Sequence, residues 1–180
     1  MAITSNLANT YQAFSAGCTR YLSDISLLAL RLIAAKVFIN SGLLKWNGWF
    51  DFDTQQYDLF LYEFFCPDPI REGALLLCDP NTLDYVEGSS VVSLIKVLAV
   101  SSGVLEVLLP VLLILGLFTR LGALGLIGMT IFIQLAVFPT LSHWWNPAAW
   151  WAVVLFATFA RGPGIFSLDH LFRLDRQKSK

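Results

Sequence analysis

The segment "RLIAAKVFINSGLLKW" (Arg31–Trp46) decides the fold, because it is an apolar run of membrane-spanning character that three cations interrupt. These cations are Arg31, Lys36 and Lys45. A charged side chain near the middle of a bilayer costs ~3 kcal/mol or more, so such groups normally face the interior of a helix bundle and pair there. The segment therefore predicts a membrane helix that packs in a bundle with polar partners.

The composition of the whole chain agrees with a membrane protein. Of its 180 residues 56% are hydrophobic and 14% are charged, with a mean hydropathy of +0.64, whereas a soluble domain is about a quarter charged. Apolar runs near or above the roughly 17 to 25 residues that span a bilayer occupy residues 24–45, 94–117 and 121–140, and a shorter run occupies 147–161. We predict an all-α fold, a polytopic membrane protein whose four transmembrane helices form one bundle and one domain over residues 1–180.

The flanking cations predict the orientation of this bundle. On one side lie Arg20, Arg120, Arg161, Arg173, Arg176, Lys178 and Lys180. On the other side lie Lys45, Arg71 and Lys96. The positive-inside rule then places both termini in the cytoplasm, together with a tail at 162–180, and places the long loop 46–93 outside. We therefore expect a multi-pass protein of a cytoplasmic membrane.

The outer loop carries two further signals. In "YDLFLYEFF" (57–65) apolar residues recur at helical spacing with Asp58 and Glu63 on the other side, which predicts an amphipathic helix that lies on the outer leaflet or caps the bundle. Cys66 and Cys78 share this loop, and an oxidising compartment favours a disulfide between them, in a structural role rather than as a redox-active pair. His143 and His170 fall on opposite sides of the membrane, so we predict no metal centre.

Polar residues of three predicted helices reach one layer near the midplane. Counted at ~1.5 Å per residue from the cytoplasmic ends, Lys36 lies at about 18 Å, Glu106 at about 17 Å and Gln134 at about 20 Å. Glu106 is the only carboxylate within the predicted spans, so it is the expected counter-ion for a buried cation. Such a pair has two readings that the sequence leaves open, a structural lock between helices or part of a functional site.

Helical phase favours Arg31 as the partner of Glu106. A stripe at spacings of three and four runs along the first predicted span through Arg31, Ala35, Phe38, Gly42 and Lys45. Lys36 and Asn40 lie about 140° to 180° around the helix from this stripe. Arginine also has the reach and the forked geometry that suit a carboxylate. We therefore predict an Arg31–Glu106 pair, with Lys36 turned to a second interface or extended toward the headgroups.

Three motifs in order give the chain a family resemblance. They are Arg31 followed by "SGLLKW", the stretch "EVLLPVLLILGLFTRLGAL" (Glu106–Leu124), and "ARGPGIFSLDHL" (Ala160–Leu171). Together they resemble the DoxX family of bacterial four-helix inner-membrane proteins, over about residues 24–50 and 91–172. The resemblance implies a compact bundle in a bacterial inner membrane, associated with respiratory or redox chemistry. The family includes the DoxD-type subunit of thiosulfate:quinone oxidoreductase.

By this resemblance the residues of interest are Arg31, Gly42, Lys45, Glu106, Arg120, Gly162, Gly164 and Asp169. Gly42 would permit close helix contact. For Lys45 we expect an anchor in the headgroups rather than an anion site. For Arg120 we expect a topological anchor in a short turn rather than a functional cation, and the "GPG" of the third motif is expected to end a helix.

Two classes of function follow. In the first, the bundle holds a quinone among aromatic walls near Glu106, and a partner redox or periplasmic protein delivers electrons, because the chain has no recognisable flavin, haem or metal motif. In the second, the chain is a non-enzymatic membrane scaffold, chaperone or small-solute carrier. Membrane lipids are partners in both, homo-oligomers are open, and no nucleic-acid motif is present. Whether the chain catalyses a reaction alone is also left open.

Overall fold

The computed structural model describes residues 2–48, 50–86 and 88–174, of which residues 2–8, 20 and 21 are described by their backbone alone. Its α-helices are α1 (Ala2–Leu43), α2 (Thr54–Asp58), α3 (Ser90–Leu115), α4 (Thr119–Phe132), α5 (Leu141–His143), α6 (Ala149–Arg161) and α7 (Leu168–Leu171). Three π-helical segments are η1 (Leu59–Phe64), η2 (Ile133–Val137) and η3 (Trp144–Ala148). The predicted all-α class is confirmed. The side chain of Arg20 and the tail cations Arg176, Lys178 and Lys180 lie outside the described part.

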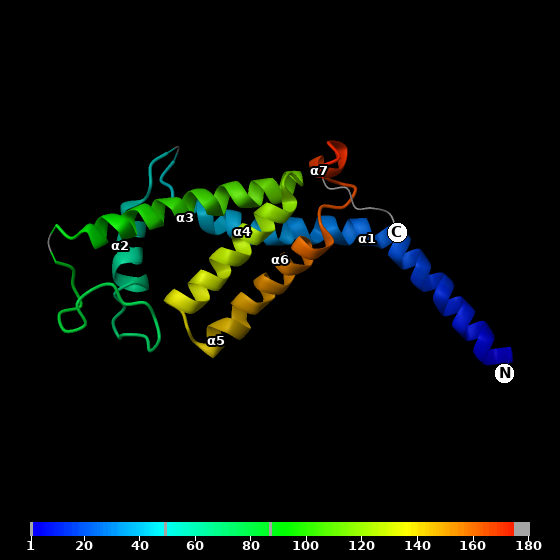
Figure 1. Cartoon of the computed structure of the whole chain (residues 1–180), viewed down its shortest axis with the longest axis horizontal. Coiled ribbons are helices and arrows are strands. Elements are labelled where there is room, and N and C mark those ends of the chain that lie inside the picture. The colour runs from blue at the N-terminus through cyan, green and yellow to red at the C-terminus, as the bar shows by residue number, and fades with distance from the viewer. Residues whose placement is uncertain (1, 49, 87, 175–180) are drawn as a thin grey trace.

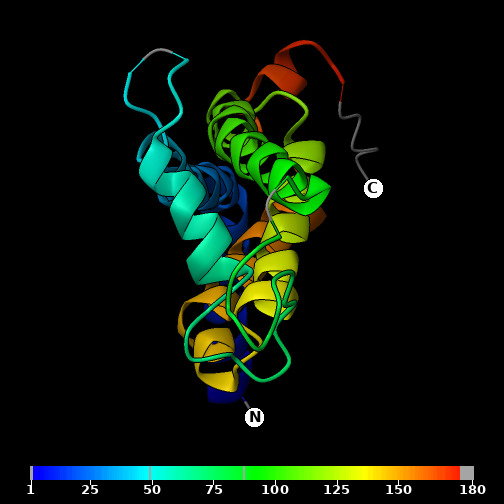
Figure 2. The same cartoon turned by 90° about the vertical axis from the view of Figure 1, so that its left-hand side faces the viewer.

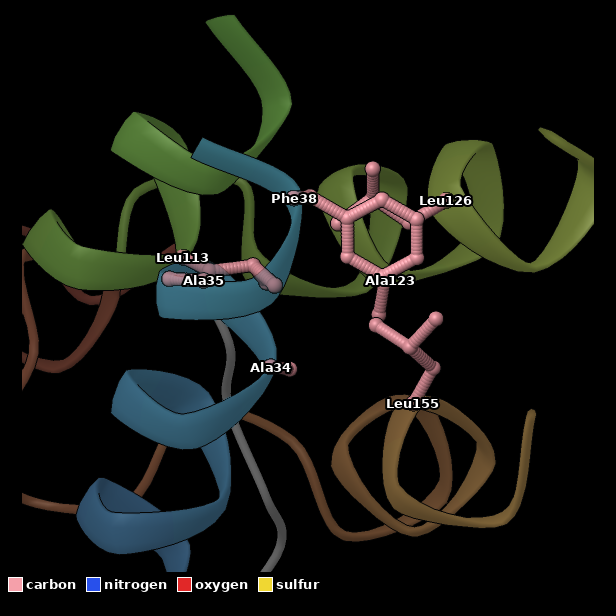
Figure 3. Packing of buried hydrophobic residues seen from close by; sticks show 7 residues of the cluster. All are labelled: Ala34, Ala35, Phe38, Leu113, Ala123, Leu126 and Leu155. Atoms are coloured by element: carbon pink, nitrogen blue, oxygen red, sulfur yellow. The ribbon is translucent and has the colours of Figure 1, made fainter. Parts of the chain in front are cut away.

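Four helices pack in a closed ring. The second half of α1 runs antiparallel beside α3, α3 packs on α4, α4 on α6, and α6 returns to α1 (Figures 1 and 2). Figure 3 shows the apolar centre of this ring, where Phe38 of α1 points toward α4 and toward Leu155 of α6. The other buried members are Ala34, Ala35, Leu113, Ala123 and Leu126. Small residues on α1 let the aromatic ring fill the space between the helices.

Two of these helices are long and apolar enough to cross a membrane. They are α3, with 26 residues, and the continuous helix of α4 and η2, with 19, and they overlap the predicted spans 94–117 and 121–140. Many large apolar side chains of α3 and α4 are exposed, among them Val97, Leu108, Leu121 and Leu124. A surface of this kind suits contact with lipid.

The first and last helices of the ring differ in length from the predicted spans. The helix α1 contains most of the expected segment 24–45 but begins at Ala2, so a long first part precedes the bundle (Figure 1). The helix α6 has 13 residues and ends at Arg161, followed by the capping residue Gly162, whose backbone has a φ of 81°. The predicted stop at "RGPG" is therefore confirmed.

The outer loop forms the expected amphipathic helix, from Thr54 to Phe64 in α2 and η1. It begins where the Asp53 carboxylate accepts a hydrogen bond from the backbone N–H of Gln55, at 2.9 Å. Its face with Phe60 and Leu61 is buried in a second apolar cluster, which also contains Phe52, Phe65, Ile95 and Ala99. Asp58 and Glu63 are exposed as predicted. Of the two expected placements, packing against the bundle is the one observed.

A disulfide and a tyrosine hold the rest of this loop. Cys66 and Cys78 form a disulfide with Cα atoms 5.6 Å apart, and a bridge that closes so short a loop stabilises a fold by roughly 3 kcal/mol in the chain-entropy model. The Tyr85 hydroxyl donates to the carbonyl of Leu61 at 2.7 Å. Burial, and secondarily the nearby Tyr62, raise the pKa of Tyr85 to about 12. The hydroxyl therefore stays a donor throughout the physiological pH range.

Candidate functional site

The centre of the site is a buried ion pair between Lys45 and Glu106. The Lys45 Nζ lies 2.6 Å from Glu106 Oε2 and also contacts the Ser41 hydroxyl at 3.3 Å. Lys45 is 7% exposed and Glu106 5% exposed. A short charge-assisted contact with so little water satisfies both groups where neither could stand alone.

A glycine sets the register of this pair. A Cβ atom at Gly42 would lie 2.9 Å from the backbone carbon of Glu106 and 2.9 Å from Val107 Cγ2. Only glycine lets α1 and α3 approach this closely, so the predicted role of Gly42 is confirmed. Lys45 comes just after the end of α1, and side chains lean toward the helix N-terminus. The ammonium group can therefore fold back over Ser41 onto Glu106.

The predicted Arg31–Glu106 pair is wrong. Gly42 is the residue of α1 that lies beside Glu106. Arg31 precedes Gly42 by eleven residues, which is about 16 Å along the helix axis at the usual rise, so Arg31 is too far from Glu106 to pair with it. The expectation that Lys45 is a headgroup anchor is wrong for the same reason, since Lys45 is the residue that reaches the carboxylate.

The predicted buried stripe on α1 is confirmed, although the predicted pairing of Arg31 with Glu106 is not. Arg31, Ala35, Phe38, Gly42 and Lys45 are all buried, whereas Lys36 and Asn40 are exposed on the outward face of α1. The predicted common layer of Lys36 and Glu106 does not form, because Gly42, six residues after Lys36 on α1, is the residue beside Glu106. Gln134 bonds within the outer turn instead. Phase along one helix was readable from the sequence, while the relative depth of separate helices was not.

A cavity of about 470 Å³ opens beside the ion pair. Its polar lining includes Ser41, Lys45, Ser102, Glu106 and His143. Its aromatic walls are Phe60, Phe64, Phe65, Phe132, Phe138 and Trp151. Ligand pockets commonly have volumes of about 300 to 1,000 Å³ with apolar walls and a few polar groups, and this cavity has that form.

A second polar pair stands at the outer end of the cavity. Gln134 Nε2 donates to the carbonyl of Thr140 at 3.1 Å, and Gln134 Oε1 lies 2.7 Å from His143 Nδ1. Since Oε1 can only accept, Nδ1 carries the proton, and Nε2 is left as the acceptor of the ring. Burial lowers the pKa of His143. The imidazole is therefore neutral at neutral pH.

The outer loop contacts this end of the cavity through a stack of Arg71, Phe138 and His143. The Arg71 guanidinium lies 4.5 Å from the centre of the Phe138 ring, and the His143 ring stacks on Phe138 with centres 4.8 Å apart. Arg71 also donates to the carbonyl of Val137 at 3.2 Å. A loop far away in sequence thus fixes two of the residues that line the cavity.

Arg31 belongs to a different cluster, at the opposite end of the bundle. It is fully buried, and its guanidinium donates to the carbonyl of Leu113 at 3.4 Å and to the carbonyl of Phe166. A Cβ atom at Gly116 would lie 2.0 Å from Arg31 Nη1. The positive φ of Gly116, 65°, and the space that it leaves are both needed here. Arg31 therefore ties the segment after α6 to the turn between α3 and α4.

Asp169 completes this cluster by capping the N-terminus of α4, although it lies far from α4 in sequence. Its carboxylate accepts from the backbone N–H groups of Phe118 and Thr119 at 2.8 and 2.9 Å. Phe118 at the start of α4 has no side-chain acceptor of its own, so the helix N-terminus is satisfied by a residue some fifty positions later. Arg120 donates to the carbonyl of Phe159 at 2.8 Å, so it also links two helices.

The residues expected from the motifs thus fall into two groups. Gly42, Lys45 and Glu106 meet at the cavity, whereas Arg31, Arg120 and Asp169 hold the other end, where Gly162 and Gly164 have positive φ angles. Sequence reasoning gave Ser41, Arg71 and Trp151 no role in this site; Arg71 served only to orient the bundle, and Trp151 was expected in an aromatic belt at the outer interface. The only signal for Arg71 was its place in the acidic outer loop, and no pattern pointed to its stacking.

Comparison with known proteins gives one match. The DoxX family model matches residues 80–139, which include all of α3 with Glu106 and all of α4. No curated protein and no solved structure is significantly similar to the chain. The matched third of the chain contains the carboxylate of the ion pair and one wall of the cavity.

Proposed function

Because the chain is a member of the DoxX family, and because a charged pair lies beside an aromatic cavity in its bundle, we propose that it is a membrane subunit for respiratory or redox chemistry that binds a quinone. The quinone ring occupies the cavity, and a partner protein supplies or removes electrons. The observation that carries this proposal is the Lys45–Glu106 pair within aromatic walls.

The shape and chemistry of the cavity suit a quinone headgroup. The headgroup is a flat ring with an oxygen at each of two opposite edges, so it needs apolar walls above and below and polar groups at its ends. Phe64, Phe65 and Trp151 are among the aromatic side chains that line the cavity, and aromatic rings stack favourably on such a ligand. Polar groups come from two separate places, the ion pair and His143.

These polar groups suit both oxidation states. The Lys45 ammonium donates hydrogen bonds, which suits the carbonyl oxygen of the quinone. Glu106 and the neutral His143 accept them, which suits the hydroxyl groups of the quinol. A proton released on oxidation of the quinol has an acceptor at each end of the ring.

The partner acts from the outer side in this proposal. The outer loop, with its disulfide and the stack of Arg71 on Phe138 and His143, surrounds that end of the cavity. In the same proposal α1, α3, α4 with η2, and α6 form four spans with both termini in the cytoplasm, and the disulfide is structural.

Accessibility of engineered cysteines tests this topology. A cysteine at Gln55 or Asp58, both within the loop 46–93, should react with a membrane-impermeant maleimide in intact cells. A cysteine at Phe172 should react only after the membrane is opened, because seven cations flank that side. The reverse pattern would show that the orientation is inverted.

Quantification of bound quinone tests the ligand. The protein purified in mild detergent should carry quinone near one molecule per chain, measured by extraction and mass spectrometry. Gly128 lines the cavity, and a Cβ atom there would meet nothing within 4 Å. Gly128→Leu should fill the cavity and lower the retained quinone about tenfold, a change of ~1.4 kcal/mol in binding.

The matched control lies on the same helix. Leu124 is half exposed on the outward face of α4, so Leu124→Phe should leave the quinone content unchanged. Wild-type protein without quinone, or equal retention in Gly128→Leu and wild type, would contradict the proposal. That result would favour a scaffold or carrier instead.

A further inference from the structure

The first part of α1 lies outside the ring of packed helices. Residues 9–16 are all exposed, and Tyr11 and Phe14 are 71% and 69% exposed. Figure 1 shows this part extending beyond the four packed helices, and Figures 1 and 2 both show it bending away from the line of the rest of α1. A helix that exposes two large aromatic side chains on one face needs a surface to cover them.

The sequence of this part is amphipathic but uncharged. Leu7, Tyr11, Phe14 and Cys18 follow one another at spacings of four, three and four, so they share one face. Asn9 and Ala16 lie about 160° to 180° around the helix from that face. Residues 1–19 contain no Asp, Glu, Lys, Arg or His. The polar side consists instead of asparagine, glutamine, serine and threonine.

We propose that residues 2–19 lie in the plane of the membrane, in the headgroup region of the leaflet through which α1 enters, with the face of Tyr11 and Phe14 turned into the lipid. Three observations support a lipid surface as the occupant. The segment is continuous with the part of α1 that packs beside the candidate span α3, so in the proposed topology it is already held at the bilayer. Its bend turns it away from the line of that helix. Tyrosine and phenylalanine are residues that anchor helices at the interface.

A second copy of the chain suits this face less well. Coiled-coil pairs specify register and orientation through charged residues that flank the apolar seam, and residues 1–19 provide none. The same absence of charge means that the helix binds lipid by apolar insertion and not by attraction to anionic headgroups. The proposal needs only the membrane insertion of α1, and it is independent of quinone binding and of which side the terminus occupies.

Spin-label accessibility in the full chain tests the proposal. In a Cys18→Ser background that keeps Cys66 and Cys78, single cysteines replace Asn9, Tyr11, Phe14 and Ala16, and the labelled protein is placed in phosphatidylcholine vesicles. Labels at 11 and 14 should be more accessible to oxygen than to a water-soluble nickel chelate. Labels at 9 and 16 should show the opposite preference. Addition of phosphatidylglycerol or salt should leave the pattern unchanged.

Three results would overturn the proposal. Equal water accessibility at all four positions would mean that the helix projects freely. Dipolar broadening at 11 and 14 that disappears on dilution with unlabelled protein would mean that a second copy covers the face. A pattern that appears only with anionic lipid would mean that charge holds the helix. As a check without labels, Tyr11→Ser with Phe14→Ser should make the native Cys18 react severalfold faster with a soluble maleimide, whereas Gln12→Ser should not.

Discussion

Glu106→Gln is expected to lower the free energy of unfolding by ~3 to 5 kcal/mol, because it leaves the buried Lys45 ammonium without its counter-charge. Lys45→Met should lower the free energy of unfolding by a similar amount, since it leaves the buried Glu106 carboxylate without its counter-charge. Unfolding in mixed micelles with increasing sodium dodecyl sulfate measures both changes.

The double variant separates the ion pair from general damage. Lys45→Met combined with Glu106→Gln should lose clearly less than the sum of the two single losses, which is the sign of direct coupling. Arg31 with Glu106 is the matched control, because these residues share no partner, so their losses should add within ~0.5 kcal/mol. Additivity for Lys45 with coupling for Arg31 would contradict the observed pairing.

Arg31→Met is expected to have the second large effect, ~3 to 5 kcal/mol. It removes two charge-assisted hydrogen bonds, each worth roughly 1.5 to 3 kcal/mol. The Leu113 carbonyl keeps its hydrogen bond from the Gly116 backbone N–H, whereas the part-buried Phe166 carbonyl loses the guanidinium donor. The segment after α6 should then detach from the turn at Gly116 and become sensitive to protease. Detergent-induced unfolding and proteolysis within residues 162–171 measure the two consequences.

Two further variants sharpen this test. Arg31→Lys keeps the charge but lacks the forked geometry that reaches two carbonyls, so it should recover only part of the loss. Arg120→Met removes the hydrogen bonds of a half-buried side chain to the carbonyls of Phe159 and Ala160, and because this side chain is less buried, a smaller loss of about 1 to 2 kcal/mol is expected. If Arg31→Met were no worse than Arg120→Met, the fully buried guanidinium would not hold the segment as described.

The sequence predicted single helices better than the relations between them. The buried stripe of α1, the helix after Asp53 and the stop at Gly162 follow from local periodicity, capping and backbone freedom, which act within a few residues. The pairing of Glu106 depends on the register of α1 against α3, which the close contact at Gly42 sets. The residue pattern within either helix alone does not determine that register.

Backbone partners were the other obstacle to prediction. Arg31 bonds to carbonyl oxygens, one of them at Phe166, 135 residues later, and any residue type supplies such an oxygen. Asp169 bonds to backbone N–H groups in the same way. The motifs marked these residues as notable, but a side chain that binds backbone has no complementary side chain in the sequence to identify its role.

The separation of Lys45 from Glu106 also has a consequence in time. The two residues are 61 positions apart, and a ribosome that adds about 5 to 20 residues per second makes Glu106 roughly 3 to 12 seconds after Lys45. Throughout that interval Lys45 exists without its counter-ion. Lys45 lies just past the end of α1, so it can wait in the headgroup region until α3 arrives. The bundle is therefore expected to close only when the second apolar helix enters the membrane.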